Sequence, residues 1–368
     1  MIEFSKNASL LIYMSVFLLS AFLFSSYRRG KGYRLFAIIS SSLLPAVLSG
    51  IRYSVGTDYF SYVSIFRMIR NTSVISFSFK QWIEPGFRLL VKMLSLVGGD
   101  NFCFGSIAFI TILIFELAII EFYGKYNENE EQTSGRLKGN YELALLIYLL
   151  CFFPVSFNAT RHVLAASIAF YAVQFAYSNR VRCGVLLFMA CTIHVAAIIA
   201  IPLAFLPENA NKKINTKLLT GMYIAFAIAV IFRGPILSLV TRLLHRFSSY
   251  GEATLSNRDF WIKLLVVCLI TLYIRSICGN YMLHINYHAY VLAVILCILG
   301  FRMAYVKRVA FIYELSLCLV APTIPSFYFD YRNTIIVKSF IVIGSIAYFI
   351  LLFYVSGSHG IFPYAIKF

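Results

Sequence analysis

Long apolar stretches, separated by short polar segments, dominate the chain. A membrane-spanning helix needs about 20 mostly apolar residues, and several stretches reach or approach that length. The apolar windows are Ala8–Ser26, Leu35–Gly50, Phe102–Phe122, Tyr141–Phe157, Val163–Tyr177, Val185–Leu206, Leu218–Phe232, Trp261–Ile277, Ile285–Gly300, Val309–Pro322 and Ile335–Tyr354. The pattern predicts an all-α, polytopic integral membrane protein with about 11 transmembrane helices. The polar gaps are too short for a soluble domain, so we expect residues 1–368 to form a single integral membrane domain.

The composition narrows the class of protein. Of 368 residues, 60% are apolar and only 13% are charged, whereas soluble domains are about 45–50% apolar and about 25% charged. This excludes an ordinary soluble enzyme, a disordered chain and a coiled coil. The net charge is +17, from 32 Lys and Arg against 15 Asp and Glu. These charges are too sparse for a nucleic-acid surface, and they indicate either membrane orientation or a site for an anionic substrate.

Basic residues between the windows predict the orientation in the membrane. Arg28, Arg29, Lys31 and Arg34 form the strongest basic cluster, and the positive-inside rule places such a cluster in the cytoplasm. The short N-terminus and the segment 52–80 are then outside. No small-residue cleavage site follows the first window, so we expect an uncleaved anchor.

The window Val185–Leu206 conflicts with this rule if it is a single span. The basic turns on either side of it contain Arg180, Arg182, Lys212, Lys213 and Lys217. One resolution is a pair of short helices that meet near His194 and enter and leave from the same face, because broken helices are tolerated where they line a cavity. The alternative is that the charges of these two turns do not indicate the side of the membrane on which they lie.

The first candidate site follows the second window. Arg52 and Asp58 are six positions apart across a turn that contains glycine. Asp58 could accept a proton from a hydroxyl nucleophile, and Arg52 could hold a phosphate in forked geometry. Tyr53, Tyr59 and Tyr62 could stack on sugar rings. The same residues would also suit an aromatic belt at the membrane interface with an Arg–Asp pair.

Three further residues stand out because they interrupt apolar sequence. Arg161 lies at the junction of two windows on the expected external face, where orientation does not explain it, although a snorkelling arginine is the alternative. His194 lies within an apolar stretch and is either catalytic or a hydrogen-bonded core residue. Arg302 lies between two late windows without an evident partner.

Signals for metals and common cofactors are weak. The eight cysteines are scattered, without a C-x-x-C spacing, so a disulfide framework or zinc site is not expected. No P-loop, GxGxxG, HExxH or G-x-S-x-G motif occurs. Glu116 and Glu314 lie inside apolar windows, where a carboxylate is costly, and we expect each to pair with an arginine of a neighbouring helix, a proton relay being the alternative.

Taken in order, the motifs resemble those of the EpsG/Wzy-type polysaccharide polymerases. The pattern is R-x-x-x-G-x-D-x-x-x-Y, then E-P-x-F, then N-x-x-R-x-x-x-A, then a histidine with a following alanine, a Tyr-Gly outer loop and a late arginine. The residues are Arg52, Gly56, Asp58, Tyr62, Glu84, Pro85, Phe87, Asn158, Arg161, Ala165, His194, Ala197, Tyr250, Gly251 and Arg302. Two positions depart from the family: His162 replaces a usual glutamine, and Ala196 replaces a usual serine.

The resemblance implies a function and partners. The family joins undecaprenyl-pyrophosphate-linked oligosaccharide repeat units into O-antigen, capsule or exopolysaccharide on the outer, periplasmic side of the bacterial cytoplasmic membrane. A GT-C-like fold with short external loops and interfacial helices is therefore expected. The implied partners are the lipid-linked oligosaccharides, the lipid bilayer and a chain-length regulator, and no nucleic acid. No cofactor and no metal is expected.

The resemblance also assigns roles to residues. Asp58 is the first candidate for the base and His194 the second. The implied pyrophosphate and sugar contacts are Arg52, Tyr59, Tyr62, Glu84, Asn158, Arg161, Tyr250 and Arg302. A flippase or polysaccharide exporter is the main alternative, although the internal repeats typical of transporters are not evident. An acyltransferase that modifies sugars and a ligase that transfers finished polymer also remain open.

Overall fold

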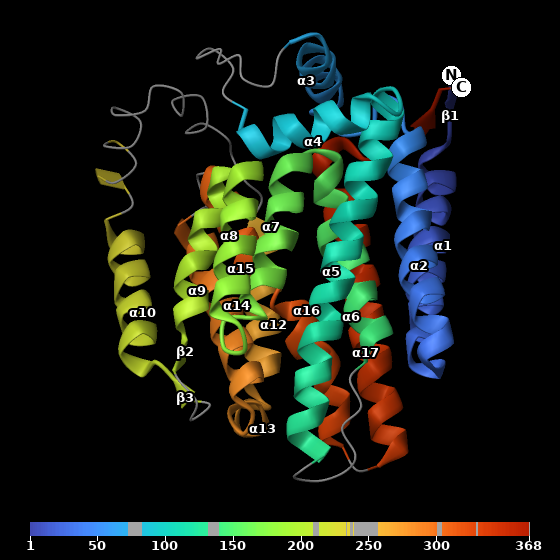
Figure 1. Ribbon diagram of the computed structural model, residues 1–368. Coiled ribbons are helices and arrows are strands. Elements are labelled where there is room, and N and C mark those ends of the chain that lie inside the picture. The colour runs from blue at the N-terminus through green and yellow to red at the C-terminus, as the bar shows by residue number, and fades with distance from the viewer. Residues whose placement is uncertain are drawn as a thin grey trace.

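The computed structural model describes residues 1–72, 83–131, 140–208, 213–232, 234–235, 238, 257–299, 304–328 and 330–367. These residues are mostly helical, and the helices run side by side as a bundle (Figure 1). Two short antiparallel strand pairs join β1 (Ile2–Glu3) to β4 (Ala365–Ile366) and β2 (Pro207–Glu208) to β3 (Lys213–Ile214). The predicted all-α membrane class is confirmed. The GT-C-like fold stays a prediction.

Within the described ranges, five helical segments are long and apolar enough to cross a membrane. They are Lys6–Arg29, Lys31–Ile51, Asp100–Tyr126, Arg308–Phe327 and Tyr331–Val355. Shorter apolar helices are Tyr141–Phe157, Val195–Phe205, Thr216–Ala229, Trp261–Thr271 and Tyr281–Cys297. Helices satisfy their own backbone hydrogen bonds, which lipid cannot do, and this is why apolar sequence becomes helical here. The expected total of about 11 spans stays a prediction.

The helix bounds agree broadly with the apolar windows. In the first half they are α1 (Lys6–Ser25), η1 (Ser26–Arg29), α2 (Lys31–Ile51), α3 (Tyr59–Asn71), α4 (Pro85–Ser95), α5 (Asp100–Glu131), α6 (Tyr141–Ile147), η2 (Tyr148–Phe152), η3 (Phe153–Phe157), α7 (Thr160–Val173) and α8 (Arg180–Ile193). In the second half they are η4 (Val195–Ala200), α9 (Ile201–Phe205), α10 (Thr216–Ile231), α12 (Asn257–Thr271), α13 (Ile274–Cys278), α14 (Tyr281–Leu299), α15 (Ala304–Glu314), α16 (Leu317–Val320), η7 (Ala321–Phe327), α17 (Tyr331–Phe349), η8 (Ile350–Val355) and η9 (Ser358–Gly360).

The acidic residues inside the bundle have partners other than arginine. Glu116 of α5 accepts hydrogen bonds from Ser41 Oγ at 2.6 Å and Ser42 Oγ at 2.9 Å, both on α2. Glu314 of α15 pairs with Lys263 Nζ of α12 at 2.7 Å. The expected arginine partners are therefore wrong in both cases. Hydroxyl groups and lysine satisfy the carboxylates instead, as buried polar groups require.

Two helices lie across one end of the bundle. α3 and α4 cross above the ends of the other helices (Figure 1), and α4 has only 11 residues. One face of α4 buries Phe87 and Val91, whereas Leu89 and Met93 on the other face are exposed. This pattern is typical of an interfacial helix. The segment after Glu84 therefore lies across the end of the bundle and does not span it.

The window Val185–Leu206 is broken at His194. α8 ends at Ile193, His194 is extended with φ −157° and ψ 124°, and η4 and α9 follow. α9 runs back toward β2, so the two arms form a hairpin (Figure 1). The predicted pair of short helices is confirmed, and His194 lies at its turn.

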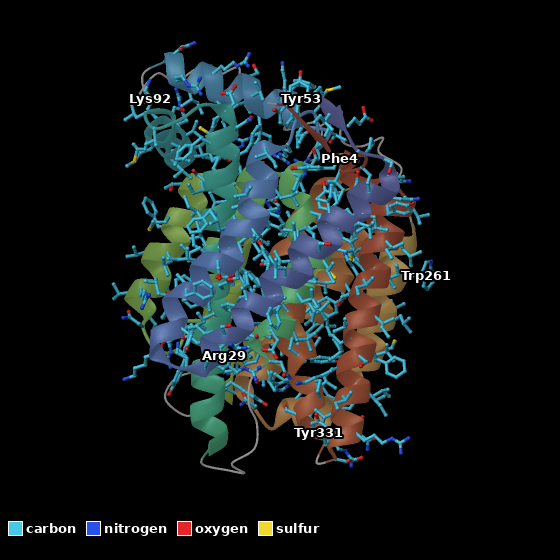
Figure 2. The ribbon with its side chains drawn as sticks, turned by 90° about the vertical axis from the view of Figure 1, so that its right-hand side faces the viewer. Phe4, Arg29, Tyr53, Lys92, Trp261 and Tyr331 are labelled. Carbon is cyan, nitrogen blue, oxygen red and sulfur yellow. The ribbon has the colours of Figure 1, made fainter. Side chains whose placement is uncertain are left out.

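The two ends of the bundle differ in the residues they carry. Figure 2 shows Phe4, Tyr53 and Lys92 at one end, and Arg29 and Tyr331 toward the other. The chain termini meet at the first end, where Phe4 N donates to Tyr364 O at 2.9 Å. We call this end the α3–α4 end. The basic cluster 28–34 therefore lies away from the α3–α4 end.

Candidate functional site

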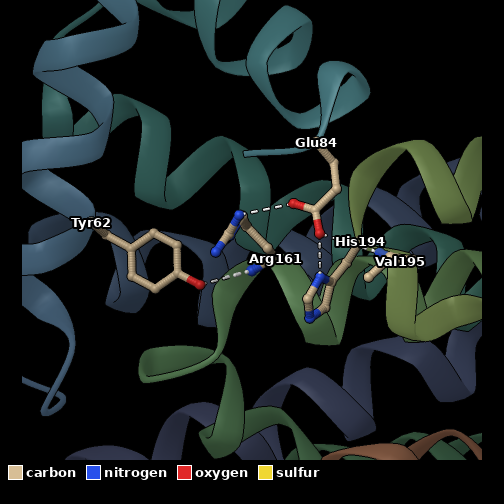
Figure 3. A network of polar contacts seen from close by, with 5 residues as sticks. All are labelled: Tyr62, Glu84, Arg161, His194 and Val195. Atoms are coloured by element: carbon tan, nitrogen blue, oxygen red, sulfur yellow. Dashed lines mark hydrogen bonds and ion pairs between the residues drawn. The ribbon is translucent and has the colours of Figure 1, made fainter. Parts of the chain in front are cut away.

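The centre of the candidate site is the carboxylate of Glu84. One oxygen, Oε2, lies 2.9 Å from Nη1 of Arg161. The other, Oε1, accepts a hydrogen bond from Nδ1 of His194 at 2.7 Å and from the backbone N of Val195 at 3.2 Å. Figure 3 shows that these groups converge from different elements. Glu84 thus joins an arginine and a histidine that the sequence suggested separately.

Local structure explains why Glu84 reaches its partners. Pro85 is the first residue of α4, a position that favours proline because its missing N–H is not needed there. Glu84 is therefore the N-cap residue, immediately before the helix. Gly86 lies against the turn of the α8 hairpin, and a Cβ atom there would come within 2.8 Å of Thr192 O. Because Gly86 has no side chain, the start of α4 can pack closely against the end of α8. This contact brings Glu84 to His194.

The charge of Glu84 is set by its neighbours. Burial alone raises the pKa of Glu84, because only 6% of its side chain is exposed. The hydrogen bond from His194 and the charges of His194 and Arg161 act in the opposite direction and outweigh it, so the pKa of Glu84 lies below its ordinary value. Glu84 is therefore a carboxylate at neutral pH and accepts every bond it makes here.

Arg161 keeps a donor for a ligand. Its backbone N donates to Tyr62 OH at 3.3 Å, and its guanidinium carbon lies 5.7 Å from the centre of the Phe87 ring. Nη1 is used by Glu84, and Nε is buried without a hydrogen-bond partner among the residues that the structure describes, so a ligand would meet the exposed part of the guanidinium instead. The side chain is 20% exposed. Arg161 is therefore anchored on one side and still able to bind an anion.

The wall beside His194 contains His162, one of the two residues that depart from the family pattern. The His162 ring is buried, its centre lies 5.4 Å from that of His194, and the two planes are perpendicular. On its other side, His162 contacts the ring of Phe311 at 5.5 Å. His162 thus packs behind the candidate base.

Asp58 lies in a loop that Asn158 holds in place. Oδ1 of Asn158 accepts hydrogen bonds from Thr57 Oγ1 and from the backbone N of Asp58, the second at 2.9 Å. Gly56 has φ +95° in this loop, a conformation that favours glycine. The Asp58 side chain is half-buried, and its carboxylate makes no hydrogen bond or ion pair within the described part of the chain. Asn158 therefore holds the loop through Thr57 and the backbone of Asp58. The Asp58 carboxylate remains available to bind a ligand.

Arg52 and Tyr59 lie in a different environment. The Arg52 guanidinium carbon is 4.5 Å from the ring centres of both Phe104 and Phe157, and only 1% of Arg52 is exposed. Tyr59 is buried and stacks on Phe104 at 5.2 Å. We call this group the Arg52 cage. Burial lowers the pKa of Arg52 to about 10, so it remains a cation at neutral pH. The cage has no open face here, and contact of Arg52 or Tyr59 with a substrate stays a prediction.

A comparison with protein families gives one assignment: the EpsG family model matches residues 33–366. The chain belongs to the EpsG family. The resemblance drawn from the motifs is thereby confirmed. No curated protein and no solved structure matches this EpsG-family chain.

The EpsG-family chain brings only some of its predicted site residues together. Tyr62, Glu84, Arg161 and His194 form one network, and Asn158 and Asp58 form a second. Tyr250 and Arg302 lie outside the described residues. No group of three or more His, Cys, Asp or Glu side chains that could hold a metal ion occurs in the described ranges.

One contact of the EpsG-family site was not foreseen. Nδ1 of His359, near the C-terminus, lies 3.4 Å from Nδ2 of Asn158. Gly357 and Gly360 flank His359, and all three have positive φ. A glycine-flanked histidine in a late polar segment is the signal that sequence reasoning could have used, although nothing local connects it to Asn158.

Proposed function

We propose that this EpsG-family protein is a glycosyltransferase-type polymerase that joins undecaprenyl-pyrophosphate-linked oligosaccharide repeat units. The product would be O-antigen, capsule or exopolysaccharide. Family membership and the long apolar helices support a membrane protein of polysaccharide biosynthesis. The observation that carries the reaction is the Glu84 carboxylate between Arg161 and His194, because a base and an anion-binding group are what this transfer needs.

The reaction exchanges one bond for another at the anomeric carbon of the donor. A sugar hydroxyl of the acceptor repeat unit forms the new glycosidic bond, and the bond to the donor's lipid pyrophosphate breaks. The hydroxyl proton needs a base, and the pyrophosphate leaves with additional negative charge. Water must be excluded because it would compete as the acceptor.

His194 is the base that the geometry favours. Glu84 accepts a hydrogen bond from Nδ1–H of His194, so the lone pair of the ring is on Nε2. Nε2 is therefore the atom that takes the proton of the acceptor hydroxyl. A carboxylate that orients a histidine also stabilises the imidazolium that forms. Sequence reasoning ranked Asp58 first, but its carboxylate has no orienting partner in the described residues. We therefore assign Asp58 to binding the acceptor sugar, where a free carboxylate can accept hydroxyl hydrogen bonds.

Arg161 receives the leaving pyrophosphate. Its side chain is 20% exposed, and Glu84 fixes one side of its guanidinium. Fixed donors aimed at developing charge in a site poor in water supply a large part of catalysis. The buried cation Arg52, six positions before Asp58 in the chain, adds positive potential without contact.

The site faces outward if the basic cluster is cytoplasmic. Arg28, Arg29, Lys31 and Arg34 lie away from the α3–α4 end, to which Glu84 belongs. The positive-inside rule then assigns Glu84 and its partners to the external side of the cytoplasmic membrane. Lipid-linked repeat units would reach the site there.

The test replaces Arg161 and His194 by alanine, one at a time, and measures polymer length on a gel. Loss of one such group typically slows a reaction about 10²–10³-fold, so we expect single repeat units in place of polymer. Arg34→Ala, an exposed arginine of the basic cluster, is the control and should leave polymer length unchanged. Polymer of normal length in Arg161→Ala would overturn the proposal. Disappearance of all external repeat units would instead support a flippase.

A further inference from the structure

A groove of about 530 Å³ lies between α12 and α17. Residues of η2, α16 and η7 form its inner wall, and its lining is largely apolar. The charged residues at the groove are Lys263 and Glu314, which pair at 2.7 Å. The volume falls in the range of ligand sites, about 300–1,000 Å³.

The groove opens sideways, toward the lipid. Leu269 on the α12 rim is 52% exposed, and Phe340 on the α17 rim is 71% exposed. α17 belongs to the candidate span Tyr331–Val355, of which only 11% is buried inside the protein. Large apolar side chains on a membrane helix face acyl chains. An occupant therefore enters the groove from the bilayer and not from water.

The length of the groove favours a long chain. The wall formed by α17 and η8 runs from Val337 to Leu351, which is about 21 Å at about 1.5 Å per residue. The hydrocarbon core is about 30 Å thick, so one leaflet is about 15 Å. The groove is longer than one leaflet, and an ordinary acyl chain that stays in its leaflet would leave part of it empty. A polyisoprenoid chain is long enough to fill it.

The inner wall of the groove is continuous with the candidate site. Phe152 lines the groove, and its ring lies 5.8 Å from that of Phe311. Phe311 contacts His162, and His162 contacts His194. A row of three ring contacts among four residues thus connects the groove to the base.

Two irregular helical turns also border the groove. η2 and η8 are π-helical, and the groove is lined by Cys151 and Phe152 from the first and by Leu351 from the second. A π-helical turn is less stable than an α-helical one and occurs frequently at functional sites. Its presence on both walls points to a binding function for the groove.

We propose that this groove binds the polyisoprenoid chain of the lipid-linked substrate, while the pyrophosphate lies at Arg161. This inference rests on the proposed function. The Lys263–Glu314 pair joins α12 to α15 and neutralises its own charge, so it presents no net charge to the chain.

The test introduces a large side chain on each side of the groove. Lipid binding to the purified full-length chain is then measured by native mass spectrometry, with undecaprenyl phosphate as the probe. Gly344 lines the α17 wall, and a Cβ atom there would meet nothing within 4 Å, so the side chain of Gly344→Trp starts in open space. Leu269→Trp fills the groove from the exposed α12 rim. Gly221→Trp on α10, equally free of neighbours and exposed, is the matched control.

We expect the two filled variants to bind undecaprenyl phosphate about tenfold more weakly than wild type or the control, because each displaces several methylene groups. Farnesyl phosphate, whose chain is too short to fill the groove, should bind wild type weakly. Unchanged binding in both filled variants would overturn the proposal. Equal displacement of the probe by phosphatidylglycerol would overturn it too, since the groove would then hold ordinary membrane lipid.

The polymer assay separates this inference from the proposed function. If Arg161→Ala leaves polymer length unchanged while Gly344→Trp weakens probe binding, the polymerase assignment fails and the groove stands as a polyisoprenoid site. If Arg161→Ala stops polymer formation while Gly344→Trp binds the probe as wild type does, the groove assignment fails alone.

Discussion

Oε1 of Glu84 lies 2.7 Å from Nδ1 of His194, and the other oxygen of the same carboxylate binds Arg161 at 2.9 Å. One side chain therefore orients both the candidate base and the candidate pyrophosphate ligand. Glu84 itself is buried and makes three hydrogen bonds or ion pairs. We infer that it is a positioning residue, because both of its carboxylate oxygens are engaged by protein groups.

Replacement of Glu84 by glutamine tests this role. The amide keeps the shape of the side chain but loses the charge that holds His194 and Arg161, so we expect polymer formation to fall about 10²-fold or more. The measurement is polymer length together with the rate of polymer accumulation. Glu84→Asp keeps the charge on a shorter side chain and should retain more activity than Glu84→Gln. Equal loss in both variants would contradict a role that depends on charge.

The stability of the protein should depend on pH through Glu84. Its pKa is below the ordinary value in the folded protein, so the folded state binds this proton less readily than the unfolded state. The contribution to stability is therefore present above about pH 4.5 and disappears as the pH falls through the lower, folded pKa. We expect wild type to melt above Glu84→Gln at pH 7, and the difference to shrink below about pH 4.5. A difference in melting temperature that stays constant with pH would contradict this assignment.

A side chain at position 56 should disturb the Asp58 loop. Gly56 has φ +95°, and a Cβ atom would lie 2.9 Å from the carbonyl carbon of Phe157. Gly56→Ala therefore combines an unfavourable backbone conformation with a clash, and it should lower stability by more than about 1 kcal/mol. The melting temperature and polymer length measure the effect. Gly184→Ala is the control, because Gly184 is helical and has no neighbour within 4 Å, and it should be neutral or slightly stabilising.

The Arg52 cage should distinguish arginine from lysine. A guanidinium can stack between the Phe104 and Phe157 rings, whereas an ammonium is compact and more strongly hydrated. Arg52→Lys should therefore lower the melting temperature, by the equivalent of about 2 kcal/mol for a desolvated cation–π contact. Arg34 lies 5.2 Å from the Tyr27 ring but is exposed, so Arg34→Lys should have a smaller effect. Similar melting temperatures for the two variants would argue against the cage.

Several features of the fold can be read from the sequence because they depend on local pattern. Apolar windows become helices, since a backbone in lipid has no other way to satisfy its hydrogen bonds. The break at His194 follows from basic turns on both sides of one window, which a single span cannot place on one side of the membrane. The family follows from short motifs in a conserved order along the chain, and the match over residues 33–366 confirms it.

The site itself depends on the tertiary structure. Glu84 is 77 positions from Arg161 and 110 from His194, and no local pattern indicates which polar residues will meet across such separations. The same holds for Arg52, which looked like a ligand for phosphate but lies buried between two phenylalanines. Sequence determines which residues are costly to bury in a membrane. Only the packing of the helices decides which of them satisfy one another and which remain free to bind a substrate, because that depends on distances between segments far apart in the chain.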